Sequence, residues 1–421
     1  MHQPYFFLRE HRSSFARYTR LFINNEYVPC KDGKVFSVTN PTDGSLVADD
    51  TPLASEADVN RARLSTAVAR REMMLKFAAL LDTHSETLAE LSRITQGAPL
   101  PRLGPPTWDC GGQNGTALAT GNSFILKPSE KTPFAGLALG LLIKEAGFPP
   151  GVAQVLSGDG TTGALLARHP RIRKISFTGS IPTGKIIQKL AAESNLKRVA
   201  LELGGNSPAI IFDDANLENA VTWCVNAIVA STLQVCFAAS RVYVEESIQD
   251  KFVEKFKSAL RERGAAIGDP DQPTTLMGPL VDEAQFNKVT GFIQRGLSQG
   301  TLVLGGKRVG NTGFFVEPTL FCDVPQDAGI YQQEIFGPVR IVNTFITEEE
   351  VVCNANATEY GLMAGVFTQD INRALRVSSA LDSGMDAPFG GTKQSGIGRE
   401  NGRAAMEAFT ELKTVMVNLT Y

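Results

Sequence analysis

Apolar side chains recur at helical spacing in two early stretches of the chain. Between Arg71 and Gln96, leucine and alanine return every three or four residues, and Ser55–Val68 has a similar pattern. Ahead of these helices, Leu21–Ile23 and Glu26–Val28 are predicted as two short strands around a turn, and Val35–Asn40 as a third strand. The N-terminal part is therefore predicted to open with strands and continue with helices.

From Ser123 onward, short apolar runs alternate with helical segments. The predicted strands are residues 123–126, 152–156, 174–177, 198–203, 207–212 and 241–244. The predicted helices are residues 133–146, 160–169, 182–194, 216 onward and 249–263. This alternation is typical of βαβ units and predicts an α/β fold with parallel sheets. An isolated strand is predicted at Lys413–Leu419.

Length and charge exclude several classes of protein. At 421 residues the chain is long enough for two or three domains. Its net charge of −3 and the lack of a basic patch argue against a nucleic-acid partner, and no apolar run is long enough to span a membrane.

Six scattered cysteines and four histidines argue against a disulfide framework and against a metal site. A reducing, cytoplasmic location is expected. The arginine-rich first 20 residues make a mitochondrial location the alternative.

A glycine-containing turn follows the strand that ends at Phe177. Gly179, Ser180 and Gly184 lie between this strand and a helix, where backbone N–H groups and the helix dipole favour a phosphate. The segment Gly179–Lys185 also fits the start of a P-loop, but Ile186 stands where such a loop needs Ser or Thr for Mg²⁺. A phosphate cradle and a plain strand–helix turn both remain open from these residues alone.

Three further segments carry chemistry-bearing side chains. Lys127 and Glu130 follow a strand, where they could hold ribose hydroxyls or form an ordinary charged loop. Glu202 ends an apolar strand, which would raise its pKa toward the range of a general base unless it is ion-paired. Cys236 is either core filler or a thiolate nucleophile.

Taken together, these segments resemble the NAD(P)-dependent aldehyde dehydrogenases. The matching segments occur in the family's order, over most of the chain from about Leu21: Ala117–Asn122, Lys127–Glu130, Phe177–Ser180, Leu201–Gly205, Gln234–Cys236, Glu334–Pro338 and Pro388–Gly391. The resemblance implies oxidation of a small-molecule aldehyde to a carboxylic acid. Cys236 would form a thiohemiacetal and then a thioester, and Glu202 would activate the hydrolytic water.

The resemblance also implies a set of binding residues. Lys127, Ser129, Glu130, Gly179, Ser180, Gly184, Glu334 and Phe336 would bind the cofactor. A Glu at position 130 favours NAD, with NADP as the alternative. Val235, Phe237 and Phe389 would line the aldehyde pocket, and Glu400 would lie on a proton-relay path. No metal is implied.

The implied architecture has three parts. A Rossmann-like NAD-binding domain would cover residues 21–204 with a gap near 97–116, and an α/β catalytic domain would cover residues 205–400 with a gap near 385–388. A C-terminal strand at 411–421 would join a homo-oligomer.

The two gaps are the main departures from the family pattern. The first removes a Pro-Trp-Asn strand, whose Asn is an oxyanion donor, together with a helix and the oligomerisation hairpin. Because the lost strand is central, the neighbouring parallel strands would be left with unpaired edges. Ser231 and Leu233 also replace the family's Asn and Gly.

Two other functions follow from these departures and from the turn at Gly179. One is a catalytically impaired or non-catalytic relative, the product of truncation or mis-splicing. The other is a phosphoryl-transfer enzyme built on Gly179–Lys185, against which Ile186 argues.

Overall fold

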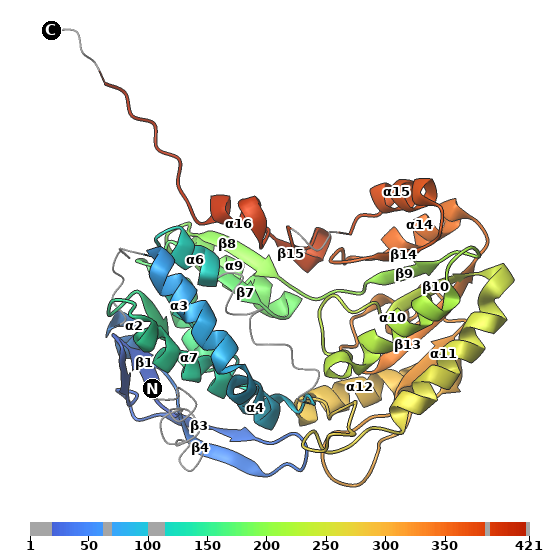
Figure 1. Ribbon diagram of the computed structural model, residues 1–421, viewed down its shortest axis with the longest axis horizontal. Coiled ribbons are helices and arrows are strands. Elements are labelled where there is room, and N and C mark those ends of the chain that lie inside the picture. Colours follow the sequence, from blue (N-terminus) through green and yellow to red (C-terminus); the bar gives the residue numbers. More distant parts are fainter. Residues whose placement is uncertain (1–18, 62–69, 100–113, 384–387, 418–421) are drawn as a thin grey trace.

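The computed structural model describes residues 19–61, 70–99, 114–383 and 388–417 (Figure 1). Two lobes face each other. The first lobe is built on residues 19–202 and is joined by residues 388–410, and the second lobe is built on residues 203–383. Among the described residues, no helix combines the length and the apolar character needed to cross a membrane.

Within the described residues, the first lobe contains two larger sheets in place of a single one. A four-stranded sheet has the order β2-β1-β6-β5, and a three-stranded sheet has the order β15-β8-β7. A hairpin of β3 and β4 lies apart from both. The bounds are β1 Leu21–Ile23, β2 Glu26–Val28, β3 Val35–Thr39, β4 Leu46–Pro52, β5 Phe124–Leu126, β6 Ala153–Val155, β7 Lys174–Thr178, β8 Arg198–Glu202 and β15 Gly396–Ile397.

Helices cover these sheets, and parallel pairing follows the predicted βαβ alternation. β5 runs parallel to β6, and β7 runs parallel to β8. The helices are α2 Glu56–Arg61, α3 Arg70–Thr83, α4 Ser85–Gln96, α6 Gly115–Ala119, α7 Pro133–Ala146, α8 Gly160–Arg168, α9 Ile181–Ser194 and α16 Gly402–Ala408. The core of this lobe lies between α7 and the strands β1 and β6, where Phe22, Phe134 and Phe148 are buried.

The second lobe is a six-stranded sheet with the order β11-β12-β13-β10-β9-β14, in which only the edge strand β11 is antiparallel. Buried cores lie on both faces of this sheet. Its strands are β9 Pro208–Ile211, β10 Arg241–Glu245, β11 Thr301–Leu304, β12 Thr319–Cys322, β13 Val339–Phe345 and β14 Gly365–Phe367. Its helices are α10 Leu217–Val229, α11 Gln249–Gly264, α12 Glu283–Gly296, α13 Gly329–Gln332, α14 Glu348–Asn356 and α15 Ile371–Ala380, with 3₁₀ turns at Ala230–Leu233, Glu246–Ile248 and Lys393–Ser395.

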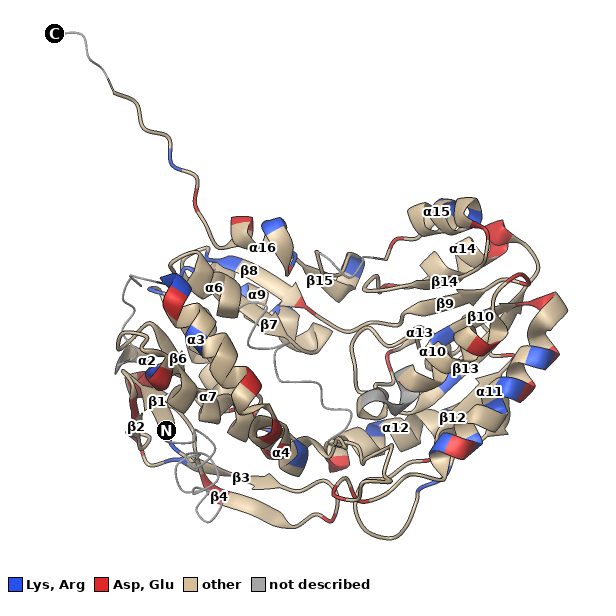
Figure 2. Ribbon diagram, viewed as in Figure 1, with Lys and Arg blue, Asp and Glu red and all other residues tan. Residues whose placement is uncertain are grey.

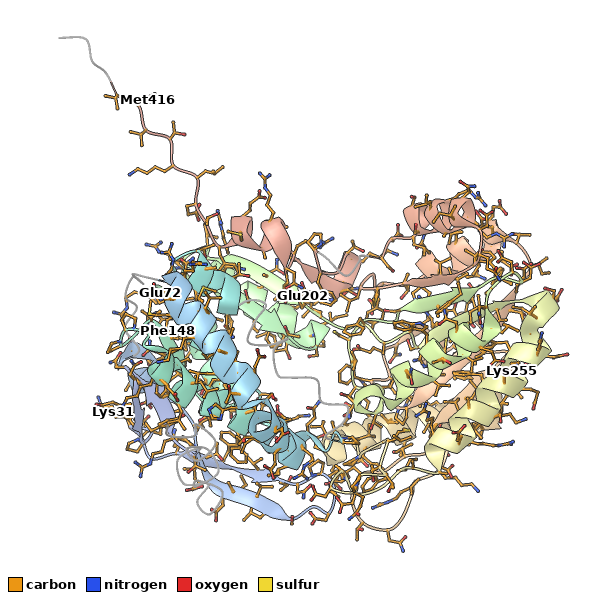
Figure 3. All side chains as sticks on the ribbon, in the orientation of Figure 1. Lys31, Glu72, Phe148, Glu202, Lys255 and Met416 are labelled. Atoms are coloured by element: carbon orange, nitrogen blue, oxygen red, sulfur yellow. The ribbon has the colours of Figure 1, made fainter. Side chains whose placement is uncertain are left out.

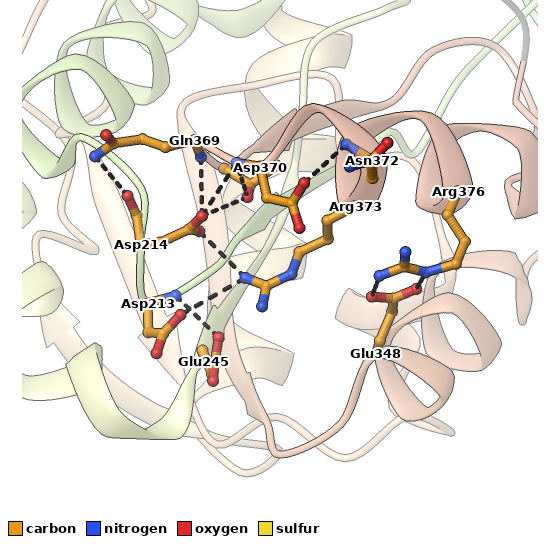
Figure 4. A network of polar contacts seen from close by, with 10 residues as sticks. Asp213, Asp214, Glu245, Glu348, Gln369, Asp370, Asn372, Arg373 and Arg376 are labelled. Carbon is orange, nitrogen blue, oxygen red and sulfur yellow. Dashed lines mark hydrogen bonds and ion pairs between the residues drawn. The ribbon is translucent and has the colours of Figure 1, made fainter.

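A polar network fixes the edge strand β14 to the rest of this sheet (Figure 4). The Asp214 carboxylate, which follows β9, accepts hydrogen bonds from the Thr368 hydroxyl and the Gln369 N–H and forms an ion pair with Arg373 at 3.2 Å. Arg373 comes from α15, so the network holds the segment between β14 and α15 against the end of β9 (Figure 4).

Two sequence predictions need correction. The single helix expected over Arg71–Gln96 is divided at the buried His84, where α3 ends and α4 begins. The His84 N–H still donates to the Leu80 carbonyl, and the Leu88 N–H still donates to the His84 carbonyl. The C-terminal strand expected at Lys413–Leu419 is not formed within this single chain over its described part, because residues 411–417 extend from the body without a strand partner among the described residues, and pairing with a second copy stays a prediction. The helix expected over Ser55–Val68 is described only up to Arg61, and its remaining residues lie outside the described part of the chain.

Among the described residues, the first lobe is divided into two sheets at the place where the sequence predicts a missing central strand, and the loss of that strand stays a prediction. β5 and β7 each end a sheet, and the two sheets are not joined by any described strand. Both predicted gaps, near residues 97–116 and 385–388, lie largely outside the described residues.

Glycine at position 140 permits the close packing of α7 on β1. A Cβ atom added there would lie 2.5 Å from the Phe22 ring and 2.9 Å from the Tyr27 hydroxyl, whereas one added at Gly160 in α8 meets nothing within 4 Å. We expect Gly140→Ala to destabilise the chain by about 1–3 kcal/mol, because Phe22 is fully buried and the Tyr27 hydroxyl is held by its hydrogen bond to the Leu137 carbonyl. Gly160→Ala is the matched control and should be neutral or stabilising by up to about 1 kcal/mol. Urea unfolding followed by circular dichroism measures both, and equal midpoints would contradict this account of the packing.

Candidate active site

Two consecutive glycines bring the main candidate residues together. β8 ends at Glu202, and the chain then crosses to the second lobe through Gly204 and Gly205. The Gly205 N–H donates a 3.0 Å hydrogen bond to the Glu334 carboxylate. A Cβ atom on Gly204 would overlap that carboxylate, and one on Gly205 would overlap the Cys236 carbonyl oxygen. Only glycine therefore allows Glu334 and Cys236 to approach this turn together.

Glu202 is a buried carboxyl group. Glu202 is 2% exposed, and neither carboxyl oxygen has a hydrogen-bond partner among the residues that the structure describes. Burial, together with the negative charge of Glu400, raises the pKa of Glu202 to about 8. The positive charge of Arg399 acts in the opposite direction and lowers this pKa. At neutral pH this group is therefore mostly protonated, and it becomes a base as the pH approaches 8. Figure 3 shows Glu202 at the side of the first lobe that faces the second.

The charge of Glu400 acts on Glu202, and Glu400 itself pairs with Phe389. Phe389 and Glu400 form an antiparallel bridge through two backbone hydrogen bonds of 2.8 and 2.6 Å. The Phe389 ring meets the half-exposed Phe237 ring edge to face, with centroids 6.2 Å apart. The predicted pocket residues Phe237 and Phe389 thus form one aromatic wall next to Cys236. Val235 packs in part against the core of the second lobe.

The segment before Cys236 is conformationally strained. Ser231, Thr232 and Leu233 have φ values of 47°, 54° and 58°, a left-handed conformation that costs L-residues free energy. Two hydrogen bonds hold it, from the Thr232 hydroxyl to the Gly278 carbonyl and from the Val281 N–H to the Gln234 side chain. Ser231 and Leu233, which depart from the family pattern, therefore occupy positions where a glycine would adopt the same backbone conformation without strain.

Cys236 is held as a neutral thiol in this arrangement. Burial raises its pKa to about 12, and the negative charges of Glu334 and Glu202 raise it in the same direction. A low-pKa nucleophilic cysteine ordinarily has a cation or a helix N-terminus beside it. The causes that shift this pKa include no cation.

The turn that contains Glu334 and Phe336 rests on α12. Gln285, in the first turn of α12, donates hydrogen bonds of 3.1 and 2.7 Å to the carbonyls of Ile335 and Phe336. These bonds stabilise Phe336 in a left-handed conformation with φ 59°. Burial raises the pKa of Glu334, while the Gly205 N–H and Lys288 lower it.

A second group of predicted residues lies at the carboxyl end of β5. The Lys127 ammonium donates to the Pro128 and Gly158 carbonyls and is 3.5 Å from Glu130. Burial lowers the pKa of Lys127. Ser129 is exposed and accepts a hydrogen bond from the Lys131 N–H. Lys131 forms a 2.6 Å ion pair with Asp282 at the start of α12, so this group is tied to the helix that supports Glu334 and Phe336.

The carboxyl end of β7 leads into the N-terminus of α9. Ser180 is the N-cap, and Gly179 donates its N–H to the Glu202 carbonyl at 3.0 Å. A place for Gly184 at the pyrophosphate stays a prediction. Its N–H donates to the Ser180 carbonyl inside the helix, and a Cβ atom there would lie 2.8 Å from Leu203. Gly184 therefore permits close packing of α9 on the segment after β8.

The P-loop interpretation of Gly179–Lys185 requires a lysine side chain that is available to a phosphate, and Lys185 is hydrogen-bonded elsewhere. The Lys185 ammonium donates a 2.6 Å hydrogen bond to Gln394, and Ile186 is exposed. Neither side chain is arranged to hold a nucleotide phosphate and its Mg²⁺.

Some residues of the site had no signal in the sequence. Gln285, Arg399 and Lys288 act on Phe336, Glu202 and Glu334 across long sequence separations and belong to no recognisable spacing. Only the close packing of the two lobes and the returning segment 388–410 brings them to the site.

Comparison with known proteins decides the family. The family model described as "Aldehyde dehydrogenase family" matches residues 106–415. The chain belongs to the aldehyde dehydrogenase family. It is 38% identical to an aldehyde dehydrogenase from Davidiella tassiana, with 97% of each chain covered, and 39% identical to retinal dehydrogenase 2 from Mus musculus, with 96% of this chain and 92% of that one covered.

Solved structures of aldehyde dehydrogenases share the fold. An indole-3-acetaldehyde dehydrogenase mutant from P. syringae, in complex with NAD+ and IAA, has a TM-score of 0.91 at 34% identity and covers 98% of this chain and 99% of that one. An aldehyde dehydrogenase from Bacillus cereus in an NAD+ complex has a TM-score of 0.89 at 34% identity, with 95% and 96% covered. The expected α/β, aldehyde-dehydrogenase-like fold is confirmed.

The same alignments show that this aldehyde dehydrogenase is shorter than its relatives. The alignment with the Davidiella tassiana protein spans 484 positions, 63 more than the 421 residues of the whole chain. The relative therefore has at least that many residues at positions where this chain has none. This agrees with internal blocks being absent here.

Burial of Glu202 makes the stability of this aldehyde dehydrogenase depend on pH. The pKa of about 8 in the folded state lies above the ordinary value of 4.5, so the folded chain binds more protons between these two pH values. Relative to Glu202→Gln, the wild type should lose stability as the pH rises through this window, by up to about 1.4 kcal/mol per pH unit. Urea unfolding across this pH range measures the effect, with Glu193→Gln on the exposed side of α9 as the control. Parallel curves for the wild type and Glu202→Gln would contradict the burial of a neutral carboxyl group.

Proposed function

We propose that this chain oxidises an aldehyde to a carboxylic acid with NAD+, through a thiohemiacetal and a thioester on Cys236. The observation that carries the proposal is the convergence of Glu202, Glu334 and Cys236 on the Gly204–Gly205 turn. Membership of the aldehyde dehydrogenase family supports the same reaction class.

The residues at the strand ends fit an NAD molecule. Lys127 and Glu130 offer an ammonium and a carboxylate to ribose hydroxyls, and the start of the 14-residue helix α9 offers N–H groups to a pyrophosphate. Glu334 and Phe336 would hold the nicotinamide end, next to Cys236. When bound, NAD+ accepts the hydride from the substrate. NADP remains the alternative cofactor, which the Glu130 carboxylate disfavours.

The chain's own groups divide the acid–base work. The Cys236 sulfur attacks the aldehyde carbon, and its proton must leave, because the thiol is neutral at the pH of the cell. Glu202 in its carboxylate form would take a proton from the water that hydrolyses the thioester, and its raised pKa suits a base near neutrality. The charge of Glu400 reaches Glu202, which supports its proposed place on the path by which the proton leaves.

The substrate would enter beside the aromatic wall of Phe237 and Phe389, with Val235 at its base. The domain roles follow: residues 21–204 would bind NAD, and residues 205–400 would carry catalysis. Because β15 at Gly396–Ile397 pairs with β8, the end of the 205–400 range adds a strand to a sheet of the proposed NAD-binding domain. A homo-oligomer joined through residues 411–421 and a cytoplasmic location stay predictions.

A catalytically impaired relative is the second candidate function. The observations that favour it are the absence of a cation among the causes that shift the Cys236 pKa and the split of the first lobe into two sheets. Loss of one oxyanion donor alone costs about 10²–10³ in rate. A chain of this kind would show a melting temperature that rises with NAD+ but no aldehyde-dependent NADH.

The two functions are separated by one substitution. We expect Cys236→Ala to lower aldehyde-dependent NADH formation by about 10³-fold or more, because no thiohemiacetal can form. Cys353→Ala removes an exposed cysteine on α14 and is the matched control, with activity unchanged. Absorbance of NADH with purified protein and a simple aldehyde measures both variants. Activity that survives in Cys236→Ala would refute the proposed nucleophile, and a wild type without turnover would favour the impaired relative.

A further inference from the structure

Asn206 is a buried polar residue immediately after the Gly204–Gly205 turn. It is 3% exposed and lies just before β9. Its side-chain amide makes two hydrogen bonds to other parts of the second lobe. The Nδ2 group donates to the Tyr331 carbonyl at 2.7 Å, and the Oδ1 atom accepts from the Ser240 hydroxyl. One side chain therefore joins the turn to two segments that are 125 and 34 residues away along the chain.

A buried cation fixes the backbone of Asn206 separately. The charged residues of α11 line the outside of the second lobe (Figure 2), whereas Arg241, at the start of β10, is 1% exposed. Its Nε group donates a 2.9 Å hydrogen bond to the Asn206 carbonyl, and its Nη groups donate to the carbonyls of Asn354 and Ala355 at the end of α14. The C-terminal end of a helix favours a cation. Asn206 is thereby fixed at the amino end of β9.

Ser240 connects Asn206 to the segment that carries Cys236. It lies four residues after Cys236 and just before β10. Its carbonyl accepts a 3.1 Å hydrogen bond from the N–H of Ile341 on β13, which is the neighbouring strand. Because its hydroxyl reaches Asn206, the end of the Cys236 segment is held beside the Gly204–Gly205 turn.

Tyr331 connects Asn206 to Glu334, which follows three residues later. Tyr331 belongs to α13, a helix of four residues that is too short to be stable without tertiary contacts. Its hydroxyl meets the Tyr243 hydroxyl, and its carbonyl accepts from Asn206. The N–H of Gly205 reaches the Glu334 carboxylate itself at 3.0 Å. Two adjacent residues after β8 therefore hold the Glu334 segment at two points.

The Tyr331 carbonyl determines the orientation of the Asn206 amide. A carbonyl only accepts hydrogen bonds, so the Nδ2 group must face Tyr331 and the Oδ1 atom must face Ser240. A shorter or apolar side chain at position 206 would take this partner away from two polar groups in a buried region. Because unpaired buried polar groups are unfavourable, the Tyr331 segment would shift toward another partner and carry Glu334 with it.

We propose that Asn206 is a positioning residue that holds the Glu334 segment against the Gly204–Gly205 turn, and so sets the place of the Glu334 carboxylate beside Cys236. This inference deepens the proposed function and rests on it for the roles of Glu334 and Cys236. Asn206 acts through Tyr331 and Ser240 and carries no chemical step itself.

Asn206→Ala tests the effect on turnover. We expect kcat/KM for aldehyde oxidation to fall about tenfold or more, because Glu334 and Cys236 lose their relative placement. Asn343→Ala is the matched control. Asn343, on β13, also joins two segments through its amide, donating to the Val324 carbonyl at 2.7 Å and accepting from the Val324 N–H at 3.1 Å, and its loss should leave kcat/KM unchanged. Asn206→Ser, whose side chain is one bond too short for both partners, is the second variant, and circular dichroism confirms the fold of each.

Alkylation of Cys236 by iodoacetamide, followed for each peptide by mass spectrometry, is a readout that needs no turnover. Cys236 is partly exposed, and burial and the negative charge of Glu334 raise its pKa. We expect Asn206→Ala to shift the pH profile of this alkylation to lower pH, with a rate at neutral pH about threefold or more above that of the wild type. Asn343→Ala should match the wild type, and the exposed Cys353 is the internal reference for the reagent.

Glu334→Gln removes the charge through which this effect would act. In that background Asn206→Ala should leave the alkylation profile unchanged, so the two substitutions should not be additive. Additive effects would overturn the proposal, since they would mean a general loosening around Cys236. Alkylation profiles that are equal in the wild type and both Asn206 variants would also overturn it, as would equal kcat/KM in Asn206→Ala and Asn343→Ala. A wild type without turnover would refute the proposed function alone, and the alkylation profiles would then decide the role of Asn206.

Discussion

The active-site arrangement depends on close approach at a single turn. Gly204 and Gly205 lie where the first lobe passes into the second, and each lacks a side chain that would displace a neighbour. Through this turn the Glu334 carboxylate reaches the Gly205 N–H, and the backbone of Cys236 packs beside it. Glu202 is two residues earlier, at the end of β8, so the proposed acid–base group and the proposed nucleophile Cys236 are both positioned by this turn.

Burial then sets the chemistry of these groups. Glu202 and Glu334 are carboxyl groups with raised pKa values, and their negative charges add to burial in raising the pKa of the Cys236 thiol. Because like charges disfavour one another in a region of low polarity, ionising any one of the three makes the next ionisation harder. The protein alone therefore disfavours the Cys236 thiolate, and a cationic partner such as the nicotinamide ring of NAD+ would shift that balance toward the thiolate.

The sequence was informative where the chemistry is local. The strand–helix alternation from Phe124 to Glu202 follows from short apolar runs and glycine stops, and the positions of Glu202 and Cys236 follow from family-like segments. The kink at His84 could not be predicted, because the apolar spacing from Leu81 to Leu88 continues through it. The packing role of Gly184 depends on Leu203 from another element, and the hydrogen bonds of Gln285 depend on the contact between α12 and the turn at Phe336.

Whether the Gly204–Gly205 turn organises the site can be tested by filling it. Gly205→Ala would push the Cys236 backbone away from the turn, whereas Gly291→Ala on α12 meets only an ordinary contact at 3.6 Å from Arg295. A displacement of about 1 Å at a nucleophile costs about 10²-fold in rate. We expect kcat/KM for aldehyde oxidation to fall by about that factor in Gly205→Ala, with the fold retained, and to stay unchanged in Gly291→Ala. Equal activity of the two variants would contradict the claim that this turn positions the proposed nucleophile, Cys236.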